Sequence, residues 1–205
     1  AGQMSGAFQI LRSNDLLWSR VVGEYLMGER PPMNDLMAWN ADGTRMPWRM
    51  HSEYLYRLYL DNELATNRFP VNGKVVRLSD IRVPMFVVGT ESDHVAPWKS
   101  VYKVDNLVRS NDLTFLLTNA GHNAGIVCGP VHPKRHYRIK TRGLADPYLP
   151  PDEWMEAATL HQGAWWPAWQ QWLAERSSAQ VKPPALGAPA KGYAVVEDAP
   201  GQYVR

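Results

Sequence analysis

Cysteine is nearly absent from this chain of 205 residues, because Cys128 is the only one. No disulfide can therefore form within the chain, and a cytosolic origin is compatible with that composition. Long apolar runs are lacking too, and none approaches the roughly 20 residues that a membrane-spanning helix needs. The N-terminus has no basic segment followed by a long apolar stretch, so the sequence does not predict a secretory signal peptide.

Excess charge of either sign is also missing, since 22 Lys and Arg side chains stand against 20 Asp and Glu. The net charge of +2 is too small to indicate a nucleic-acid partner or an anionic membrane. Aromatic side chains, in contrast, are plentiful, with nine tryptophans in a chain that is 45% hydrophobic. This composition predicts a globular core rich in aromatic packing.

The most informative pattern in the chain joins an acid to a histidine. Two short apolar runs, at 83–89 and 113–118, flank a predicted helix over 98–109. A strand–helix–strand unit of this kind places the two strands in parallel and buries them on both faces. Asp93 follows the first strand and His122 follows the second. Because the carboxyl ends of parallel strands share one edge of a sheet, we expect these side chains to lie within hydrogen-bond reach.

An acid followed by a histidine is the order in which an α/β-hydrolase completes its catalytic triad. In such a triad the acid holds the imidazole in one tautomer, and the histidine takes a proton from the nucleophile. The nucleophile should come earlier in the chain, yet the sequence contains no Gly-x-Ser-x-Gly or Gly-x-Cys-x-Gly elbow. We therefore expect the chain to be the C-terminal part of a larger enzyme. The candidates for contact with its substrate are His94, Trp98 and Asn123.

Several of these residues also have a plain structural interpretation. Asp93 could cap the helix that begins near Pro97, and His122 and His94 could be ordinary loop residues. Cys128 lies outside any strand-to-helix elbow, so we expect a small buried thiol rather than a nucleophile. A basic run predicts a solvated loop, with contact to coenzyme A phosphates as the alternative; its members are Lys134, Arg135, Arg138, Lys140 and Arg142.

The sequence predicts three parts. Residues 1–80 form a mostly helical cap, with helices over 6–27 and 47–64 and a hairpin at 71–76 made by an Asn-Gly turn. Residues 81–178 are the core, and 179–205 are an extended tail rich in Pro, Ala and Gly.

The core is predicted to contain two strands, both already described, and further helices over 151–159 and 164–175. Within the last helix, tryptophans recur at helical spacing, so we expect them to pack on the core; they are Trp165, Trp169 and Trp172.

Beyond these general patterns, the chain resembles the C-terminal half of the polyhydroxyalkanoate synthases along nearly its whole length. The most specific phrases are the Asp-His-x-x-Pro-Trp and Trp-Trp-Pro motifs. The resemblance rests on Tyr25-Leu26-Met27-Gly28, Asn34-Asp35-Leu36-Met37-Ala38-Trp39-Asn40, Asp93-His94-Val95-Ala96-Pro97-Trp98, Gly121-His122-Asn123-Ala124-Gly125 and Trp165-Trp166-Pro167-Ala168-Trp169.

The resemblance implies the C-terminal part of an α/β-hydrolase fold: two parallel strands with flanking helices, preceded by a mostly helical cap. It implies an acyltransferase that polymerises (R)-3-hydroxyacyl-CoA through a Cys-His-Asp triad, with the cysteine outside this chain. His122 would activate that cysteine, and Asp93 would orient His122 or deprotonate the 3-hydroxyl of the incoming unit. No cofactor or metal is expected beyond the coenzyme A thioester substrate.

The partners implied by the resemblance are the substrate, the growing polyester, and either a missing N-terminal half or a second copy of the chain. The expected location is the cytoplasm, with the surface of a polyester granule as the site of action. Two other classes stay open: a different α/β-hydrolase, such as a polyester depolymerase or a lipase-like esterase, and a non-catalytic granule-associated module.

Overall fold

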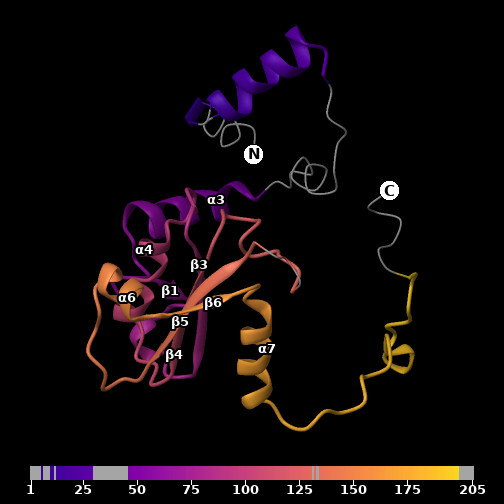
Figure 1. Ribbon diagram of the computed structural model, residues 1–205. Coiled ribbons are helices and arrows are strands. Elements are labelled where there is room, and N and C mark those ends of the chain that lie inside the picture. Colours follow the sequence, from indigo (N-terminus) through magenta and orange to yellow (C-terminus); the bar gives the residue numbers. More distant parts are fainter. Residues whose placement is uncertain are drawn as a thin grey trace. The chain divides into compact units, whose positions relative to one another are not determined.

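The computed structural model describes residues 6, 10–11, 13–29, 46–130, 132 and 134–198 (Figure 1). Two compact units divide the chain, Ala1–Leu78 and Ser79–Arg205. The short helical segment predicted at 34–40 lies outside the described residues. No helix in the described part of the chain is long and apolar enough to cross a membrane.

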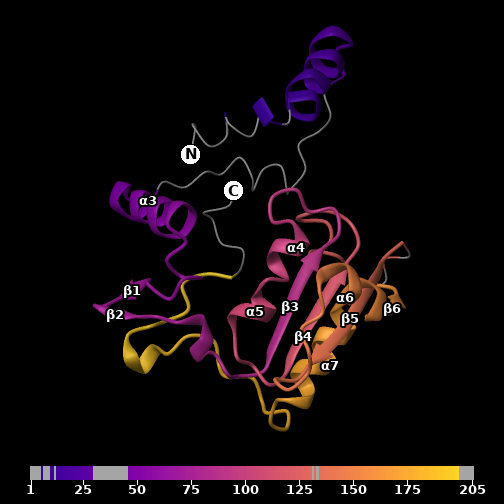
Figure 2. The same ribbon diagram turned by 90° about the vertical axis from the view of Figure 1, so that its left-hand side faces the viewer.

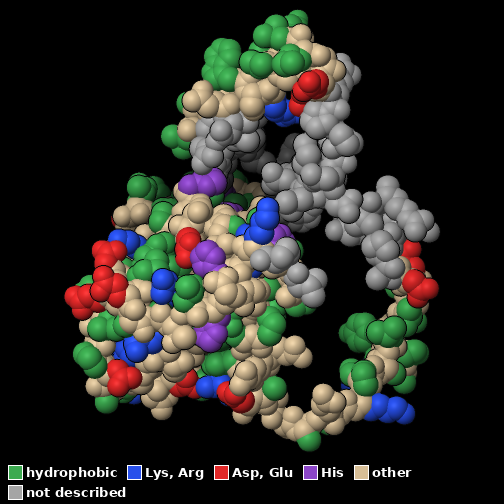
Figure 3. Space-filling model, in the orientation of Figure 1, with side chains coloured by type: hydrophobic (Ala, Val, Ile, Leu, Met, Phe, Trp, Pro, Cys, Tyr) green, Lys and Arg blue, Asp and Glu red, His purple; other side chains and the backbone are tan. Residues whose placement is uncertain are grey.

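The first unit is mostly helical and ends in a hairpin. Its helical elements are η1 (Asn14–Trp18), η2 (Val21–Leu26), α3 (Trp48–Tyr54) and η3 (Leu55–Leu60). Large apolar side chains of its first helical stretch are exposed, as Figure 3 shows, and Tyr25 is 85% exposed. The helix predicted over 6–27 is confirmed where its residues are described, whereas the one predicted over 47–64 ends at Leu60 and gives way to turns.

The predicted hairpin in the first unit is also confirmed. Strands β1 (Pro70–Val71) and β2 (Lys74–Val75) pair antiparallel. Asn72 and Gly73 turn the chain between them with φ values of 49° and 76°, the left-handed conformation that an Asn-Gly hairpin turn uses. A short 3-10 helix, η4 (Leu78–Asp80), leads into the second unit.

The second unit is built on a four-stranded sheet in the order β3-β4-β5-β6 (Figure 2). Strands β3 (Met85–Thr90) and β4 (Leu113–Thr118) run parallel, so the predicted strand–helix–strand unit is confirmed. The single helix predicted between them is divided into two short ones, α4 (Trp98–Val101) and α5 (Val104–Leu107). Within the described residues β3 pairs only with β4, so its other edge is free.

The prediction of only two strands in this sheet is wrong. Three members of the basic run, expected in a solvated loop, lie instead in β5 (His136–Arg142), which pairs antiparallel with β4. Strand β6 (Thr159–Gln162) then pairs antiparallel with β5. The high charge obscured the strand period, in which Tyr137 and Ile139 alternate with cationic residues. Lys and Arg can lie on a half-buried sheet because their aliphatic stems pack while their charged ends reach water or a partner.

Helices cover both faces of this sheet (Figure 1). On one face the ring of Phe115 from β4 packs edge-on against Tyr102 and against Trp154 of α6 (Pro151–Ala157), with both ring centroids 5.0 Å away. On the other face α7 (Trp166–Glu175) contributes Trp172, whose ring lies 5.6 Å from Phe86 of β3. Strand β4 therefore lies buried at every position, because neighbours flank both its edges and both its faces.

The final part of the described chain has little regular structure. After α7, residues 179–198 contain only η5 (Pro189–Lys191) and an isolated bridge between Ala188 and Tyr193. Most side chains there are exposed, including the large apolar ones of Val181, Leu186 and Val196. An extended course is expected for a segment rich in Pro, Ala and Gly.

Candidate active site

Asp93 lies in the tight turn that follows β3, where local hydrogen bonds hold its carboxylate. The backbone N–H groups of Val95 and Ala96 both donate to Oδ1 at 2.8 Å. The hydroxyl of Thr90, the last residue of β3, donates to Oδ2 at 3.2 Å. One oxygen therefore serves the loop, and the other faces His122. The α4 helix begins after Pro97 without a side-chain cap, so the interpretation of Asp93 as a helix cap is wrong.

The charge state of Asp93 follows from this environment. Burial raises the pKa of the carboxyl, but hydrogen bonds from the Ala96 N–H, the His122 ring and the Val95 N–H outweigh it and lower the pKa to about 2. Asp93 is therefore ionised at neutral pH and can only accept hydrogen bonds.

His122 lies in the turn after β4, directly across from Asp93. Its Nδ1 is 2.8 Å from Asp93 Oδ2, which confirms the predicted hydrogen-bond contact. An ionised carboxylate cannot donate, so Nδ1 must carry the proton. In the neutral ring this leaves the lone pair on Nε2. The His122 side chain is 47% exposed while Asp93 is only 8% exposed, so the acid is enclosed and Nε2 remains accessible.

Two residues that sequence reasoning missed hold these turns together. Thr90 bonds to Asp93 and also packs under the His122 turn at Gly125. A Cβ added to Gly125 would stand 2.6 Å from Thr90 Cγ2 and 2.9 Å from the Gly121 carbonyl oxygen, so a larger residue would push the turn away. The position of Thr90 at the end of a buried strand was the available signal, because side chains there line the sheet edge where sites form.

The remaining predicted site residues occupy different surroundings. His94 and Asn123 are exposed beside the Asp93–His122 pair in sequence. Trp98 is 9% exposed, and its ring packs against Tyr102 and Trp154 in the core. The structure therefore brings Asp93 and His122 together and places the Trp98 ring among core aromatics.

Cys128 is buried, as predicted, but its surroundings are not purely apolar. Its sulfur accepts a hydrogen bond from Arg135 Nε at 3.1 Å and donates to the Gly129 carbonyl at 3.7 Å. The thiol has no contact with His122 among the interactions of the described residues, so it is not placed as the nucleophile of this pair.

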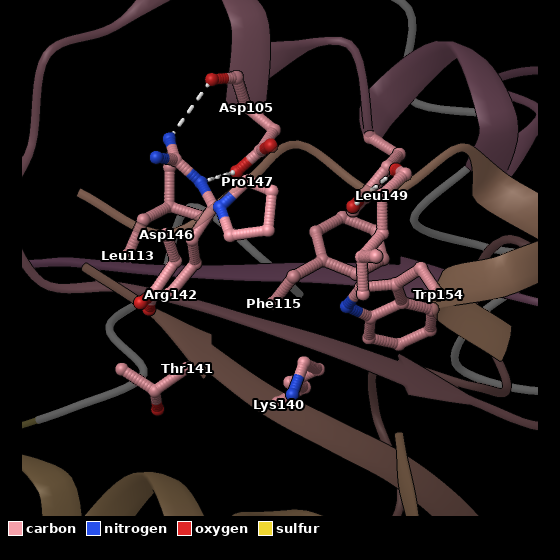
Figure 4. Close-up of a pocket in the computed structure, with 11 residues that line it drawn as sticks. Asp105, Leu113, Phe115, Lys140, Thr141, Arg142, Asp146, Pro147, Leu149 and Trp154 are labelled. Carbon is pink, nitrogen blue, oxygen red and sulfur yellow. Dashed lines mark hydrogen bonds and ion pairs between the residues drawn. The ribbon is translucent and has the colours of Figure 1, made fainter. Parts of the chain in front are cut away.

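A cavity of about 340 Å³ opens elsewhere, beside the first residue of β4 (Figure 4). Its walls include Tyr102, Phe115 and Trp154, and its polar side carries the ion pair between Asp105 and Arg142. It lies toward the opposite end of the parallel strands from Asp93 and His122, and neither residue lines it. Among the described residues, no group of three His, Cys, Asp or Glu side chains is placed to hold a metal ion.

The fold and the site together define an α/β protein with an acid–histidine pair at the carboxyl ends of two parallel strands. No protein-family model matches the chain. It is 40% identical over 205 residues to the poly(3-hydroxyalkanoate) polymerase of Methylorubrum extorquens. It is also 37% identical to the poly(3-hydroxyalkanoate) polymerase subunits PhaC of Rhizobium meliloti and Cupriavidus necator.

These three alignments each cover 99% of the chain but only 33%, 32% and 34% of the respective polymerase. The chain thus spans about a third of the length of the curated relatives that it matches. By sequence it is a homologue of part of the poly(3-hydroxyalkanoate) polymerases, and the resemblance predicted from its motifs is confirmed.

Proposed function

We propose that this chain supplies the histidine and the orienting acid for acyl transfer in a polyhydroxyalkanoate polymerase that acts on (R)-3-hydroxyacyl-CoA. The observation that carries the proposal is the Asp93–His122 hydrogen bond of 2.8 Å, in a chain homologous to these polymerases along 99% of its length. In the same proposal, β3 and β4 are the last parallel strands of an α/β-hydrolase sheet and residues 1–80 are its cap.

The chemistry follows from which nitrogen of His122 is free. Nδ1–H donates to Asp93, so Nε2 takes the proton from a cysteine thiol supplied outside this chain. The thiolate attacks the thioester carbonyl, and a new thioester to the enzyme forms as the bond to coenzyme A breaks. The imidazolium then returns its proton to the departing coenzyme A thiolate.

Asp93 acts by orienting His122 rather than by deprotonating the 3-hydroxyl of the incoming unit. Both carboxylate oxygens already accept hydrogen bonds, and the side chain is only 8% exposed. A carboxyl whose pKa lies at about 2 is also a weak base toward an alcohol, because proton transfer is most efficient when the pKa of the base lies near the working pH. This supports the imidazole as the base for both protons.

A chimera tests this function. The matched third of the Cupriavidus necator polymerase is replaced by this chain, and coenzyme A release and polymer formation from (R)-3-hydroxybutyryl-CoA are measured. We expect polymer and stoichiometric coenzyme A release, with polymer collecting on granules when the chimera is expressed in cells. A folded chimera that releases coenzyme A with only free 3-hydroxy acid as product would favour a hydrolase. A folded chimera without turnover would overturn the proposal.

A further inference from the structure

Backbone hydrogen bonds close the turn that carries His122. The carbonyl groups of Gly125 and Ile126 are left to accept hydrogen bonds from side chains outside the turn. Within the turn, the N–H of Gly125 donates to Gly121 and the N–H of Val127 donates to Asn123. The carbonyl oxygens of Gly125 and Ile126 then accept hydrogen bonds from the side chains of two consecutive tryptophans. Trp165 Nε1 donates to Gly125 at 3.1 Å, and Trp166 Nε1 donates to Ile126 at 2.8 Å.

The first of these tryptophans is fixed to the sheet. Trp165 is only 6% exposed and stacks on Phe86 of β3 at 6.4 Å with an interplanar angle of 24°. Trp166 begins α7 and is 37% exposed, and its ring lies edge-on to Trp165 at 6.0 Å. The packing of Trp165 on Phe86 and of Trp166 on Trp165 therefore fixes the two indole N–H groups, which donate to adjacent carbonyls of one turn.

The turn also packs closely against Thr90, the residue whose hydroxyl bonds to Asp93. The absence of a side chain at Gly125 allows this contact, because even a Cβ there would stand 2.6 Å from Thr90 Cγ2. The turn therefore meets Thr90 at Gly125 and the two indole N–H groups at the carbonyls of Gly125 and Ile126.

We infer that Trp165 and Trp166 are positioning residues that hold the His122 turn in register with Asp93. The inference rests on the proposed function, because it gives the Trp-Trp pair a role in the acid–histidine geometry that the polymerase reaction uses. It also separates two contributions of these side chains: ring packing in the core, and two N–H donors aimed at the turn. Phenylalanine keeps an aromatic ring at the position and removes the N–H donor.

The test replaces Trp166 by Phe and follows backbone amide exchange in the 205-residue chain by NMR. Loss of one hydrogen bond corresponds to about a fivefold change in an opening equilibrium, so the amide of Val127 should exchange about fivefold faster. Amides of β4, such as those of Leu116 and Leu117, should keep their rates. The matched control is Trp169→Phe, on the same helix and 39% exposed, with no hydrogen bond to the turn; it should leave Val127 unchanged.

A second readout reports on His122 itself. The Nδ1–H proton that donates to Asp93 gives a hydrogen-bonded resonance, which should weaken or broaden in Trp166→Phe and more strongly in Trp165→Phe. Unchanged Val127 exchange together with an unchanged Nδ1–H resonance would overturn the positioning role. Equal acceleration in the turn and in β4 would also overturn it, because that pattern shows general loss of stability.

The chimeric polymerase separates this inference from the proposed function. With an active chimera, we expect Trp166→Phe to lower kcat about fivefold while KM stays nearly unchanged, because substrate contacts are intact. An inactive chimera combined with the expected NMR changes would remove the proposed polymerase function and keep the positioning role. An active chimera whose kcat does not respond to Trp166→Phe, with no change in the NMR readouts, would keep the proposed polymerase function and remove the positioning role.

Discussion

The second unit holds two largely enclosed carboxylates, each bonded to a nitrogen-containing side chain, toward opposite ends of the parallel strands. Asp105 bonds to Arg142 at 2.5 Å, with side chains 3% and 16% exposed. Asp93 bonds to His122 at 2.8 Å, with side chains 8% and 47% exposed. The two acids are similarly enclosed, so the pairs differ mainly in the partner and in its access to solvent.

That difference separates a structural pair from a chemical one. Arginine stays protonated in proteins and presents fixed donors, so Arg142 can brace β5 against α5 but cannot pass a proton on. A histidine ring can gain or lose a proton near neutral pH, and the acid on Nδ1 decides that Nε2 does so. A buried acid thus gives no indication of function until the chemistry and exposure of its partner are known.

Removing the chemical partner should have the largest effect on activity. In the chimeric polymerase, His122→Ala should lower kcat/KM by about 10²–10⁴-fold, because among the described residues His122 is the only imidazole bonded to Asp93. The 205-residue chain itself should lose about 1 kcal/mol of unfolding free energy, because the half-exposed ring donates one hydrogen bond to the Asp93 carboxylate. Steady-state coenzyme A release and urea denaturation measure the two quantities. Wild-type turnover in His122→Ala would contradict a chemical role for the Asp93–His122 pair.

Removing the structural partner should act on stability instead. Arg142→Met leaves the Asp105 carboxylate buried without its cation, and a loss of this kind costs about 3–5 kcal/mol of unfolding free energy. Lys140→Met is the matched control, since Lys140 lies on the same strand and makes no ion pair among the described residues; it should change stability by less than about 0.5 kcal/mol. Urea denaturation of both variants decides this, and equal losses would contradict a specific role for the Asp105–Arg142 pair.

Lowering the pH should reduce the unfolding free energy of the chain, because Asp93 becomes protonated. Its pKa is lowered from 3.8 to about 2 in the folded state, so the ionised carboxylate stabilises the fold above about pH 4. That contribution is lost as the pH falls from about 4 to 2, because the unfolded chain then binds the proton more readily. Unfolding free energies at pH 2–6 should therefore fall more steeply for the wild type than for Asp93→Asn, by at most about 2 kcal/mol. Parallel pH profiles would show that Asp93 is not held as an anion.

The smallest effect should come from the sole thiol. Cys128→Ala should keep most of the chimera's turnover, because the sulfur bonds to Arg135 and Gly129 rather than to His122. Removing this small buried side chain should cost about 1 kcal/mol of stability. Thiol labelling of the unfolded chain verifies that the thiol has been removed, and coenzyme A release measures the remaining turnover of the chimera. Loss of acyl-enzyme formation in Cys128→Ala alone would make Cys128 a nucleophile.

The sequence predicts the central pair well, because two short, largely apolar runs followed by an acid and a histidine leave few arrangements. It predicts the antiparallel half of the sheet poorly. Charged residues alternate with Tyr137 and Ile139 along β5, and the cost of placing Arg142 there is offset by Asp105, which lies 37 positions earlier. Partners this distant are not visible in local patterns. The bonds from Trp165 and Trp166 to the His122 turn span 40 positions and are hidden for the same reason.

The sheet of the second unit carries every described part of the acid–histidine arrangement, from Thr90 to Trp166, within one continuous stretch of chain. Genetic exchange between homologues of this chain can therefore move the arrangement as one segment. A crossover before residue 79 would transfer Asp93, His122 and the two tryptophans together. A crossover between residues 126 and 165 would combine the His122 turn of one homologue with the tryptophans of another. Library designs that respect the first boundary should retain more active hybrids than those that cut at the second.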